Sequence, residues 1–170
     1  MATKIKKSDI VYTPDHIASW IVKYFAPTGL ILDPCMGDGA FYKQFHGKKD
    51  WCEITQGRNF FDYKNYVNWI ITNPPFSEIE KFMEHAFNLA TNVVFLLPAH
   101  KTFSSWKRIR LIENYGGIKT ILLIKGQDCN FPFRYPYGIF YFKKHYEGPT
   151  SIINCEHNKS FKRSAKNAAA

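Results

Sequence analysis

The chain has 170 residues, with 23 Lys and Arg against 14 Asp and Glu and a formal net charge of +9. This length accommodates one domain of ordinary size and excludes a second full domain. Hydrophobic residues make up 45% of the chain, enough for one core, but no apolar run approaches the ~18 residues of a membrane span. Aromatic residues make up 17% of the chain. They fit an aromatic core, or a surface that stacks on nucleic-acid bases while the positive charge attracts the phosphates.

The first predicted helix covers residues 13–25, with Thr13 as its N-cap and Pro14 at its first helical position. A short apolar strand over residues 30–33 follows. A turn with glycines at positions 37 and 39 and a short helical stretch come next. A strand, a glycine turn and a helix in this order predict the start of a βα unit.

The rest of the chain alternates between strands and helices. A helix with a capping box of Ser77 and Glu80 has apolar residues at helical spacing up to Ala90. A loop rich in Phe and Pro, over residues 131–137, precedes the last expected strand. The other expected elements are strands over 51–54, 67–72, 92–97, 118–125 and 138–143 and a loop and helix over 99–115.

Strands that are apolar almost throughout, separated by helices, predict an α/β fold. We expect a mainly parallel sheet with helices on both faces and an antiparallel last strand. Ligands in such folds bind beyond the carboxyl ends of the strands. The residues that directly follow the strands at 30–33 and 67–72 are therefore the candidate site.

The segment at the end of the first strand reads Asp33-Pro34-Cys35-Met36-Gly37-Asp38-Gly39-Ala40-Phe41. Its glycines either let the backbone approach a ligand closely or close a βα turn for structural reasons alone. A carboxylate just before the turn disfavours a pyrophosphate. It suits a ligand with an amine or a cationic centre.

The segment after the strand at 67–72 reads Asn73-Pro74-Pro75-Phe76. Two prolines can simply end a strand, but this does not explain the flanking Asn and Phe. The side-chain oxygen of Asn73 and the carbonyl of Pro74 can both accept hydrogen bonds from one planar amino group, on which Phe76 can stack. Such acceptors localise the nitrogen lone pair and stabilise the positive charge that develops as the amine attacks.

These segments match D-P-x-x-G-x-G-x-F and [DNS]-P-P-[FYW], and the chain thereby resembles the S-adenosylmethionine-dependent adenine-specific methyltransferases of DNA. The resemblance runs from Val11 to Lys144. It includes Tyr12-Thr13-Pro14, which is similar to the upstream cofactor motif of the gamma arrangement. It implies a Rossmann-like methyltransferase fold and transfer of a methyl group to the exocyclic amine of a flipped adenine, with no metal.

The resemblance also implies roles for individual residues. Glu53 would bind the ribose hydroxyls of the cofactor and Asp62 the amine of its adenine, although solvated acids are common at such positions. Phe133, or else Phe131, would stack on the flipped base, and an apolar hairpin packed on the core accounts for both rings almost as well. The catalytic residues would be Asn73, Pro74, Pro75 and Phe76. The methionine part of the cofactor would contact Tyr12, Thr13, Asp33, Pro34, Cys35, Met36, Gly37, Gly39 and Phe41.

The chain departs from the family in two places. Eight residues separate Glu53 from Asp62, so we expect the helices of this region to be missing or reduced to turns. After Lys143, 27 residues remain, too few for a separate target-recognition domain. We therefore expect a short or relaxed recognition sequence, or a partner that supplies specificity. DNA would be held by basic residues that otherwise form a solvated face, namely Lys101, Lys107, Arg108 and Arg110.

Two other classes of function remain open. The Asn-Pro-Pro-aromatic motif also occurs in enzymes that methylate adenine in RNA or the glutamine side chain of proteins, and the net charge disfavours a protein substrate. The second class is a non-catalytic nucleic-acid-binding module that keeps the fold. A damaged motif would indicate such a module, and both motifs are intact here.

The four cysteines form no C-x-x-C pair and the six histidines no ligand pattern with them, which predicts no metal site. The basic N-terminus leads into no apolar signal core. We therefore expect a cytoplasmic protein with reduced thiols, in the host cytoplasm if the source is a virus or mobile element. We expect residues 1–155 to form one catalytic domain and residues 156–170 a basic flexible tail, in a monomer or homodimer without membrane association.

Overall fold

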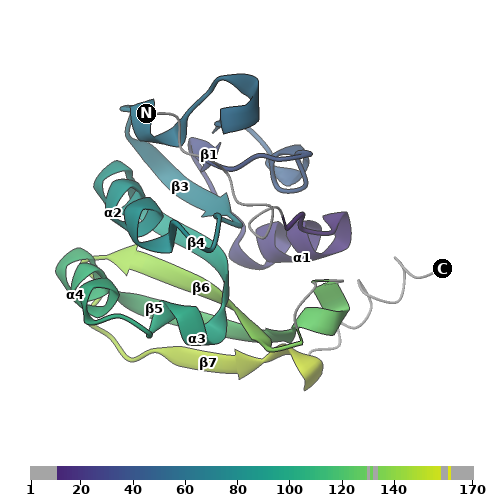
Figure 1. Cartoon of the computed structure of the whole chain (residues 1–170), viewed down its shortest axis with the longest axis vertical. Helices are drawn as coiled ribbons and strands as arrows, with labels where there is room; N and C mark the ends of the chain where they lie inside the picture. The colour runs from purple at the N-terminus through teal and green to yellow at the C-terminus, as the bar shows by residue number, and fades with distance from the viewer. Residues whose placement is uncertain (1–10, 130, 132–133, 158–160, 162–170) are drawn as a thin grey trace.

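The computed structural model describes residues 11–129, 131, 134–157 and 161, which form a seven-stranded sheet between α-helices (Figure 1). The strands are β1 (Ile31–Asp33), β2 (Lys49–Trp51), β3 (Val67–Thr72), β4 (Ala90–Pro98), β5 (Gly116–Lys125), β6 (Pro136–Lys144) and β7 (Ser151–Asn154). The α-helices are α1 (Asp15–Phe25), α2 (Ile79–Leu89), α3 (Ala99–Thr102) and α4 (Trp106–Tyr115). Short 3-10 turns are η2 (Tyr42–Gln44), η3 (Ile54–Gln56), η4 (Phe60–Asp62), η5 (Gly126–Cys129) and η6 (Cys155–His157).

The strand order is β2-β1-β3-β4-β6-β5-β7. β6 pairs antiparallel with both β4 and β5, whereas all other neighbouring strands pair parallel. The expected mainly parallel sheet with an antiparallel strand over residues 138–143 is thereby confirmed. The chain then adds β7 at the sheet edge, which the sequence analysis did not predict. β7 has four residues and no buried position, so it lacks the apolar run by which the inner strands are recognised.

β1 lies between β2 and β3. The chain leaves β1 towards β2 on one side and returns to β3 on the other, so the carboxyl ends of β1 and β3 form the switch point at which such sheets bind ligands. Asp33 ends β1 and Asn73 follows β3. The fold therefore brings the two sequence motifs to one place.

Between β1 and β3 the chain forms turns in place of helices. The helical stretch expected after the glycines is the single 3-10 turn η2, and β2 begins two residues before the strand predicted over 51–54. η3 and η4 connect β2 to β3, in agreement with the expected loss of helices. No α-helix follows the glycine turn, and the backbone N–H groups of Cys35, Met36, Gly37 and Gly39 in this turn all donate hydrogen bonds within the chain.

The first helix is not capped by Thr13 as predicted. α1 begins at Asp15, and Pro14 is its N-cap residue. Pro14 has an extended backbone conformation, and no side chain caps the helix with a hydrogen bond. The Thr13 side chain is buried, and its Oγ1 accepts a hydrogen bond from Asn73 Nδ2 at 3.2 Å. The hydroxyl thus connects α1 to the segment after β3.

The capping box predicted at the start of α2 is also wrong. The N-cap residue is Glu78, and no side-chain hydrogen bond caps the helix. Glu80 turns outward to Lys107, with an Oε1–Nζ distance of 2.8 Å. This tertiary ion pair competes with the local cap, which is why the sequence pattern misled here.

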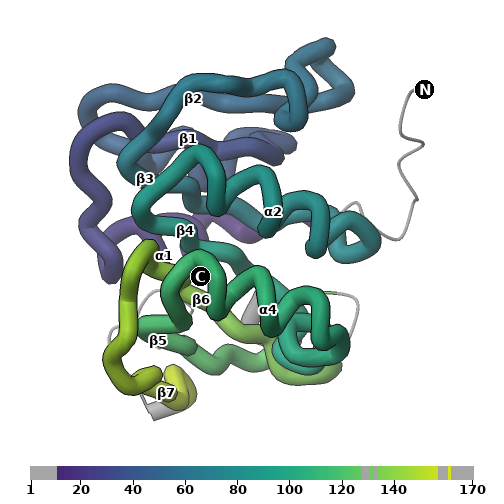
Figure 2. The backbone as a smooth tube through the Cα atoms, turned by 90° about the vertical axis from the view of Figure 1, so that its left-hand side faces the viewer, coloured from purple at the N-terminus to yellow at the C-terminus, as the bar shows by residue number. Residues whose placement is uncertain are grey.

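α2 and α4 lie side by side on one face of the sheet (Figure 2). The rings of Phe87 in α2 and Tyr115 in α4 stack with centroids 4.1 Å apart and an interplanar angle of 11°. The buried Tyr115 hydroxyl donates a hydrogen bond to the Ala90 carbonyl at 3.1 Å. The stacked rings join the two helices, and the hydrogen bond connects α4 to the start of β4.

We expect Tyr115→Phe to lower the free energy of unfolding by about 1 kcal/mol, because it removes one buried hydrogen bond and keeps the stacked ring. Urea denaturation measures this change. The matched control is Tyr66→Phe, which removes a hydroxyl that bonds Thr91 at 2.6 Å on an exposed side chain. Equal losses in the two variants would contradict the buried role of the Tyr115 hydroxyl.

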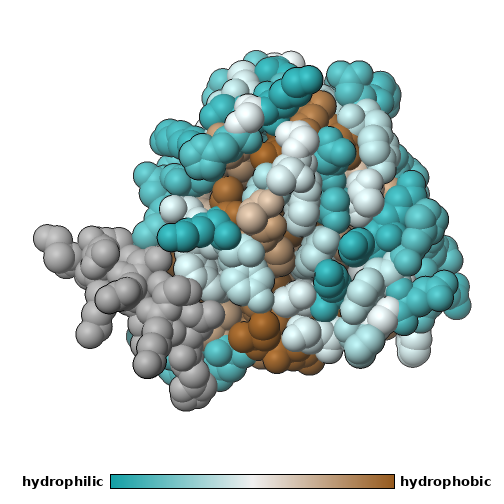
Figure 3. Space-filling view, turned by 180° about the vertical axis from the view of Figure 1, so that it is seen from behind, coloured by the Kyte–Doolittle hydropathy of each residue, from teal (hydrophilic) through white to brown (hydrophobic). Residues whose placement is uncertain are grey.

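α1 covers the other face of the sheet (Figure 1). Phe25 packs edge-to-face on Tyr141 of β6, with centroids 5.3 Å apart. Trp20 makes an edge contact at 5.0 Å with Phe161, the one described residue of the segment 158–170. Seen from behind, hydrophilic residues flank a narrow apolar band (Figure 3). In the described part of the chain, the helices are too short and too polar to cross a membrane.

Candidate active site

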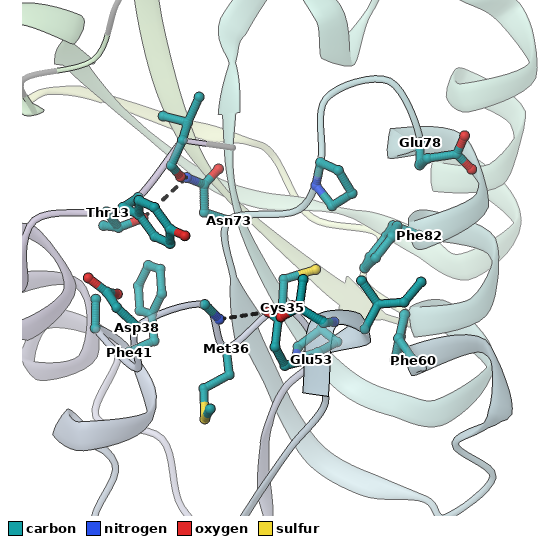
Figure 4. A pocket seen from close by; sticks show the side chains of 18 of the residues that line it. Thr13, Cys35, Met36, Asp38, Phe41, Glu53, Phe60, Asn73, Glu78 and Phe82 are labelled. Atoms are coloured by element: carbon teal, nitrogen blue, oxygen red, sulfur yellow. Dashed lines mark hydrogen bonds between the residues drawn. The ribbon is translucent and has the colours of Figure 1, made fainter. Parts of the chain in front are cut away.

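A cavity of about 250 Å³ opens at the carboxyl ends of β1 and β3 (Figure 4). The glycine turn after β1, the segment before α1, the turns after β2 and the segment after β3 form its walls. Among the residues predicted for the site, its wall contains Tyr12, Thr13, Pro34, Cys35, Met36, Gly37, Phe41, Glu53, Asn73 and Pro75. The cavity thus joins parts of both motifs in one space.

The glycine turn is held by a carboxylate from the next strand. Gly37 N–H donates to Glu53 Oε2 at 2.9 Å, and Glu53 Oε1 accepts from the backbone N–H and the hydroxyl of Thr55. Burial raises the pKa of Glu53, but these hydrogen bonds outweigh it and the net shift is downward. Glu53 is therefore ionised at neutral pH and places a negative charge in the cavity wall.

Gly37 adopts φ +55°, a left-handed conformation that favours glycine. A Cβ atom added there would lie 3.3 Å from the Tyr12 ring, which lines the same cavity. Glycine at this position lets the ring of Tyr12 lie close against the turn. The neighbouring Cys35 is a neutral wall group, because burial raises the pKa of its thiol well above the usual value.

Asp33 lies beneath the turn and not in the cavity wall. Its side chain is fully buried, and its Oδ1 accepts hydrogen bonds from the Thr72 hydroxyl at 2.8 Å and from Cys35 N–H at 3.3 Å. Burial raises the pKa of Asp33 to about 7, although these hydrogen bonds oppose the shift. Asp33 joins β1 to the end of β3, and the structure brings neither Asp33 nor Gly39 to the cavity wall.

The raised pKa of Asp33 makes its contribution to the free energy of unfolding fall as pH rises, the reverse of the usual behaviour of a carboxyl group. Between pH 3.8 and about 7 the folded chain holds a proton that the unfolded chain releases, so this contribution falls as pH rises through that window. We therefore expect Asp33→Asn to be more stable than the wild type at pH 8, where the wild type carries a buried charge. The advantage should shrink at pH 5, as measured by urea denaturation.

The control for this pH dependence is Asp50→Asn. Burial raises the pKa of Asp50, but hydrogen bonds from Trp51 N–H and Arg58 lower it overall. Its stability contribution is therefore present at neutral pH and is lost on acidification, the opposite sign from Asp33. A stability difference between Asp33→Asn and the wild type that stays constant from pH 5 to pH 8 would contradict the account.

Asn73 is the most informative side chain of the cavity. Its Nδ2 donates to the Val11 carbonyl at 2.9 Å and to Thr13 Oγ1 at 3.2 Å. A carbonyl can only accept, so the contact with Val11 fixes which end of the amide carries the nitrogen. The buried Oδ1 has no hydrogen-bond partner among the described residues. The segment before α1 thus holds Asn73 so that a fixed acceptor is left for a ligand.

The other residues of this motif divide between the cavity and the core. Pro75 lines the cavity, whereas Pro74 and Phe76 do not. The Phe76 ring is buried beside Tyr137, with centroids 6.1 Å apart, and Lys101 Nζ lies 5.9 Å from its centroid. Stacking of Phe76 on a planar ligand would require access to a ring that is packed in this structure.

The turns after β2 supply the aromatic wall. Asn59, Phe60 and Phe61 line the cavity, together with Phe82 from α2. Asp62 is exposed and stays outside this wall. The predicted contact between Asp62 and the cofactor is thus not supported by its position, and Asn59 is the polar side chain that this turn presents.

The residues predicted to bind the substrate differ in their exposure and in their contacts. Phe131 is buried against Tyr137 at 4.6 Å, as a core residue of the hairpin would be, and Phe133 lies outside the described residues. Lys107 forms an ion pair with Glu80, and Arg108 is largely buried next to the same carboxylate. Arg110 is exposed.

The sequence analysis missed several polar residues of the cavity wall. Asp38, Asn59, Ser77 and Glu78 all line it. Asp38 lies inside the first motif, between its two glycines, and Ser77 directly follows the second motif, so the side chains at these two positions could have been included from the sequence. Asn59 carried no such signal, because its neighbour Asp62 has the more obvious functional group.

No protein-family model and no curated protein matches the chain. Several solved structures match the chain. A modification subunit of a candidate type I restriction enzyme from Vibrio vulnificus superposes with a TM-score of 0.63 at 16% identity, over 85% of this chain and 46% of that one. A candidate class I S-adenosylmethionine-dependent methyltransferase from Listeria monocytogenes gives a TM-score of 0.64 at 14% identity, over 96% and 72% of the two chains.

A candidate RNA methyltransferase from Pyrococcus horikoshii matches 87% of this chain and 92% of its own, with a TM-score of 0.58 at 15% identity. At such identities these similarities establish the fold alone. The chain has the Rossmann-like fold of these methyltransferases, as predicted. It spans less than half the length of the Vibrio vulnificus modification subunit.

Proposed function

We propose that the protein is an S-adenosylmethionine-dependent methyltransferase that methylates the exocyclic amine of adenine in DNA. The observation that carries this proposal is the Oδ1 atom of Asn73, a buried acceptor without a partner among the described residues. An acceptor held in place by two hydrogen bonds on its own amide nitrogen suits a ligand that brings an N–H group.

The cavity fits the cofactor in chemical character. Glu53 offers an ionised carboxylate for hydroxyl groups, and Asn59 offers an amide beside the aromatic side chains of Phe60 and Phe61. Met36 and Gly37 of the glycine turn line the cavity, so the turn can contact a ligand. When bound, S-adenosylmethionine supplies an electrophilic methyl group on a sulfonium sulfur.

Asn73 and Pro74 act on the acceptor amine. Asn73 Oδ1 accepts a hydrogen bond from one N–H group of this amine. The Pro74 carbonyl is proposed to accept from the other, which requires this carbonyl to be brought to the cavity, because Pro74 lies outside the cavity wall in this structure. The two contacts localise the nitrogen lone pair and stabilise the developing positive charge. The nitrogen forms the new N–C bond with this lone pair, the electrons of the C–S bond stay on sulfur, and one amine proton leaves to solvent. Pro75 keeps the segment rigid, so that the acceptor does not have to reorient during attack.

The basic charge of the chain suits DNA and RNA alike. We propose DNA because structurally similar chains include a modification subunit of a type I restriction enzyme. Phosphate contacts position a protein on DNA, whereas base-edge contacts give specificity. The described residues form a single sheet with its helices, and this leaves little surface to read base edges. We therefore propose a short or relaxed recognition sequence, or a partner that supplies it.

The test is transfer of a labelled methyl group to separate pools of DNA, RNA and protein. We expect label in DNA, at sites no longer than about four base pairs when the modified positions are mapped. Label confined to RNA or to protein would contradict the proposed acceptor. Binding of DNA without any transfer would favour the non-catalytic module.

A further inference from the structure

Two large aromatic side chains are exposed at the junction of α3 and α4. Trp106 is 76% exposed and Phe103 is 51% exposed, whereas most aromatic side chains of the described residues are packed in the core. Phe103 keeps one edge contact with Phe140, at 5.9 Å between centroids. Large apolar rings in water are a cost to the isolated chain that a binding partner can offset.

This junction lies beside the candidate catalytic motif. Lys101 Nζ is 5.9 Å from the centroid of Phe76. Ser105 Oγ donates to Glu80 Oε2 at 3.4 Å. Glu80 lies in the first turn of α2, which begins just after that motif. α2 and α4 lie side by side (Figure 2). A strand of nucleic acid that presents a base to Asn73 would therefore pass close to Trp106.

The junction is held rigidly by Arg108. Its Nη1 donates to the Lys101 carbonyl and to Ser104 Oγ, the latter at 3.1 Å. The guanidinium therefore stabilises the turn between the two helices. The substrate contact of Arg108 stays a prediction, and the structural role of Arg108 fixes the backbone that carries the two exposed rings.

Basic residues lie close to the two rings in the sequence. Lys101 and Arg110 flank them in sequence, and Lys107 follows Trp106 directly, although Glu80 neutralises part of its charge. Aromatic rings between cations are the combination that binds unpaired bases and the adjoining phosphates. In a duplex the base faces are covered by their neighbours, so exposed rings can stack only on bases that have left the stack.

We infer that Trp106 and Phe103 form a stacking surface for unpaired bases next to the target, so that single-stranded or locally opened DNA is the preferred substrate. The identity of the target base rests on the proposed function. Binding to the stacking surface needs no cofactor and no transfer, and it can be tested independently of the reaction.

The experiment measures binding of a fluorescent single-stranded DNA oligonucleotide and of the same sequence as a duplex by anisotropy, with the full chain. We expect the wild type to prefer the single strand. Trp106→Ala should weaken single-strand binding about 5- to 100-fold, the loss expected from one stacked base, and change duplex binding much less. Phe103→Ala should act in the same direction, with a smaller loss because its ring is partly packed.

Tyr66→Ala is the matched control, because Tyr66 is also an exposed aromatic residue, 54% exposed, but precedes β3 at the opposite end of the strand from Asn73. It should leave single-strand binding unchanged. Equal losses for Trp106→Ala and Tyr66→Ala, or an equal loss on single strand and duplex, would overturn the inference. If Trp106→Ala loses single-strand binding while the wild type methylates no DNA, the stacking surface stands and the proposed function fails.

Discussion

We expect Asn73→Ala to lower methyl transfer by orders of magnitude, with S-adenosylmethionine binding largely retained. The side chain provides an acceptor for the attacking amine, and its two hydrogen bonds to Val11 and Thr13 hold that acceptor in place. Loss of one preorganised group of this kind costs about 10²- to 10³-fold in turnover. Turnover is measured with labelled cofactor on DNA, and cofactor binding by calorimetry.

Thr13→Val provides the graded control for Asn73→Ala. It removes the 3.2 Å hydrogen bond to Asn73 Nδ2 and leaves the 2.9 Å bond to Val11. The acceptor is then less well oriented but still present, so we expect a loss of about tenfold, from one weakened hydrogen bond. If Asn73→Ala lowered cofactor affinity as strongly as turnover, the residue would belong to the cofactor site and not to the amine site.

The second large effect concerns Glu53. Glu53→Ala removes the carboxylate proposed for the ribose hydroxyls and also the acceptor that holds Gly37 N–H at 2.9 Å. Hydrogen bonds to a charged group are worth about 1.5–3 kcal/mol, so we expect the dissociation constant of S-adenosylmethionine to rise by about 10- to 100-fold or more. Isothermal titration calorimetry measures the change.

Asp62→Ala is the control for the effect of Glu53→Ala on cofactor affinity. Asp62 is exposed and lies outside the cavity wall, so we expect its replacement to leave cofactor affinity unchanged, whereas Asn59→Ala lowers it. A loss of affinity in Asp62→Ala, with none in Asn59→Ala, would restore the role that the family resemblance implied for Asp62. It would also require the turn over residues 59–63 to rearrange when the cofactor binds.

The places of the two motifs in the fold could be predicted from the sequence, because each motif follows an apolar strand. β3 has the predicted bounds, and Asp33 accepts a hydrogen bond from Thr72, which directly precedes Asn73, so the two motifs lie together at the carboxyl ends of β1 and β3. A parallel sheet places the ends of neighbouring strands together whatever the intervening loops do. The fold class and the location of the candidate site were therefore predictable.

The direction of each side chain was not predictable in the same way. Thr13 looked like a helix cap but bonds to Asn73, 60 residues away, and Glu80 pairs with Lys107 in preference to capping its own helix. Local patterns weigh local partners only, and both residues found distant ones. β7 was missed for a related reason, because pairing with β5 and not an apolar run of its own defines it as a strand.

The most direct test of the central claim is the identity of the methylated atom. DNA incubated with the protein and S-adenosylmethionine is digested to nucleosides, which are separated and analysed by mass spectrometry. The proposed function predicts N6-methyladenine from DNA treated with the wild type and about 10²- to 10³-fold less from DNA treated with Asn73→Ala. Methylation of a cytosine or of a ring nitrogen by the wild type, or N6-methyladenine formed equally by Asn73→Ala, would contradict it.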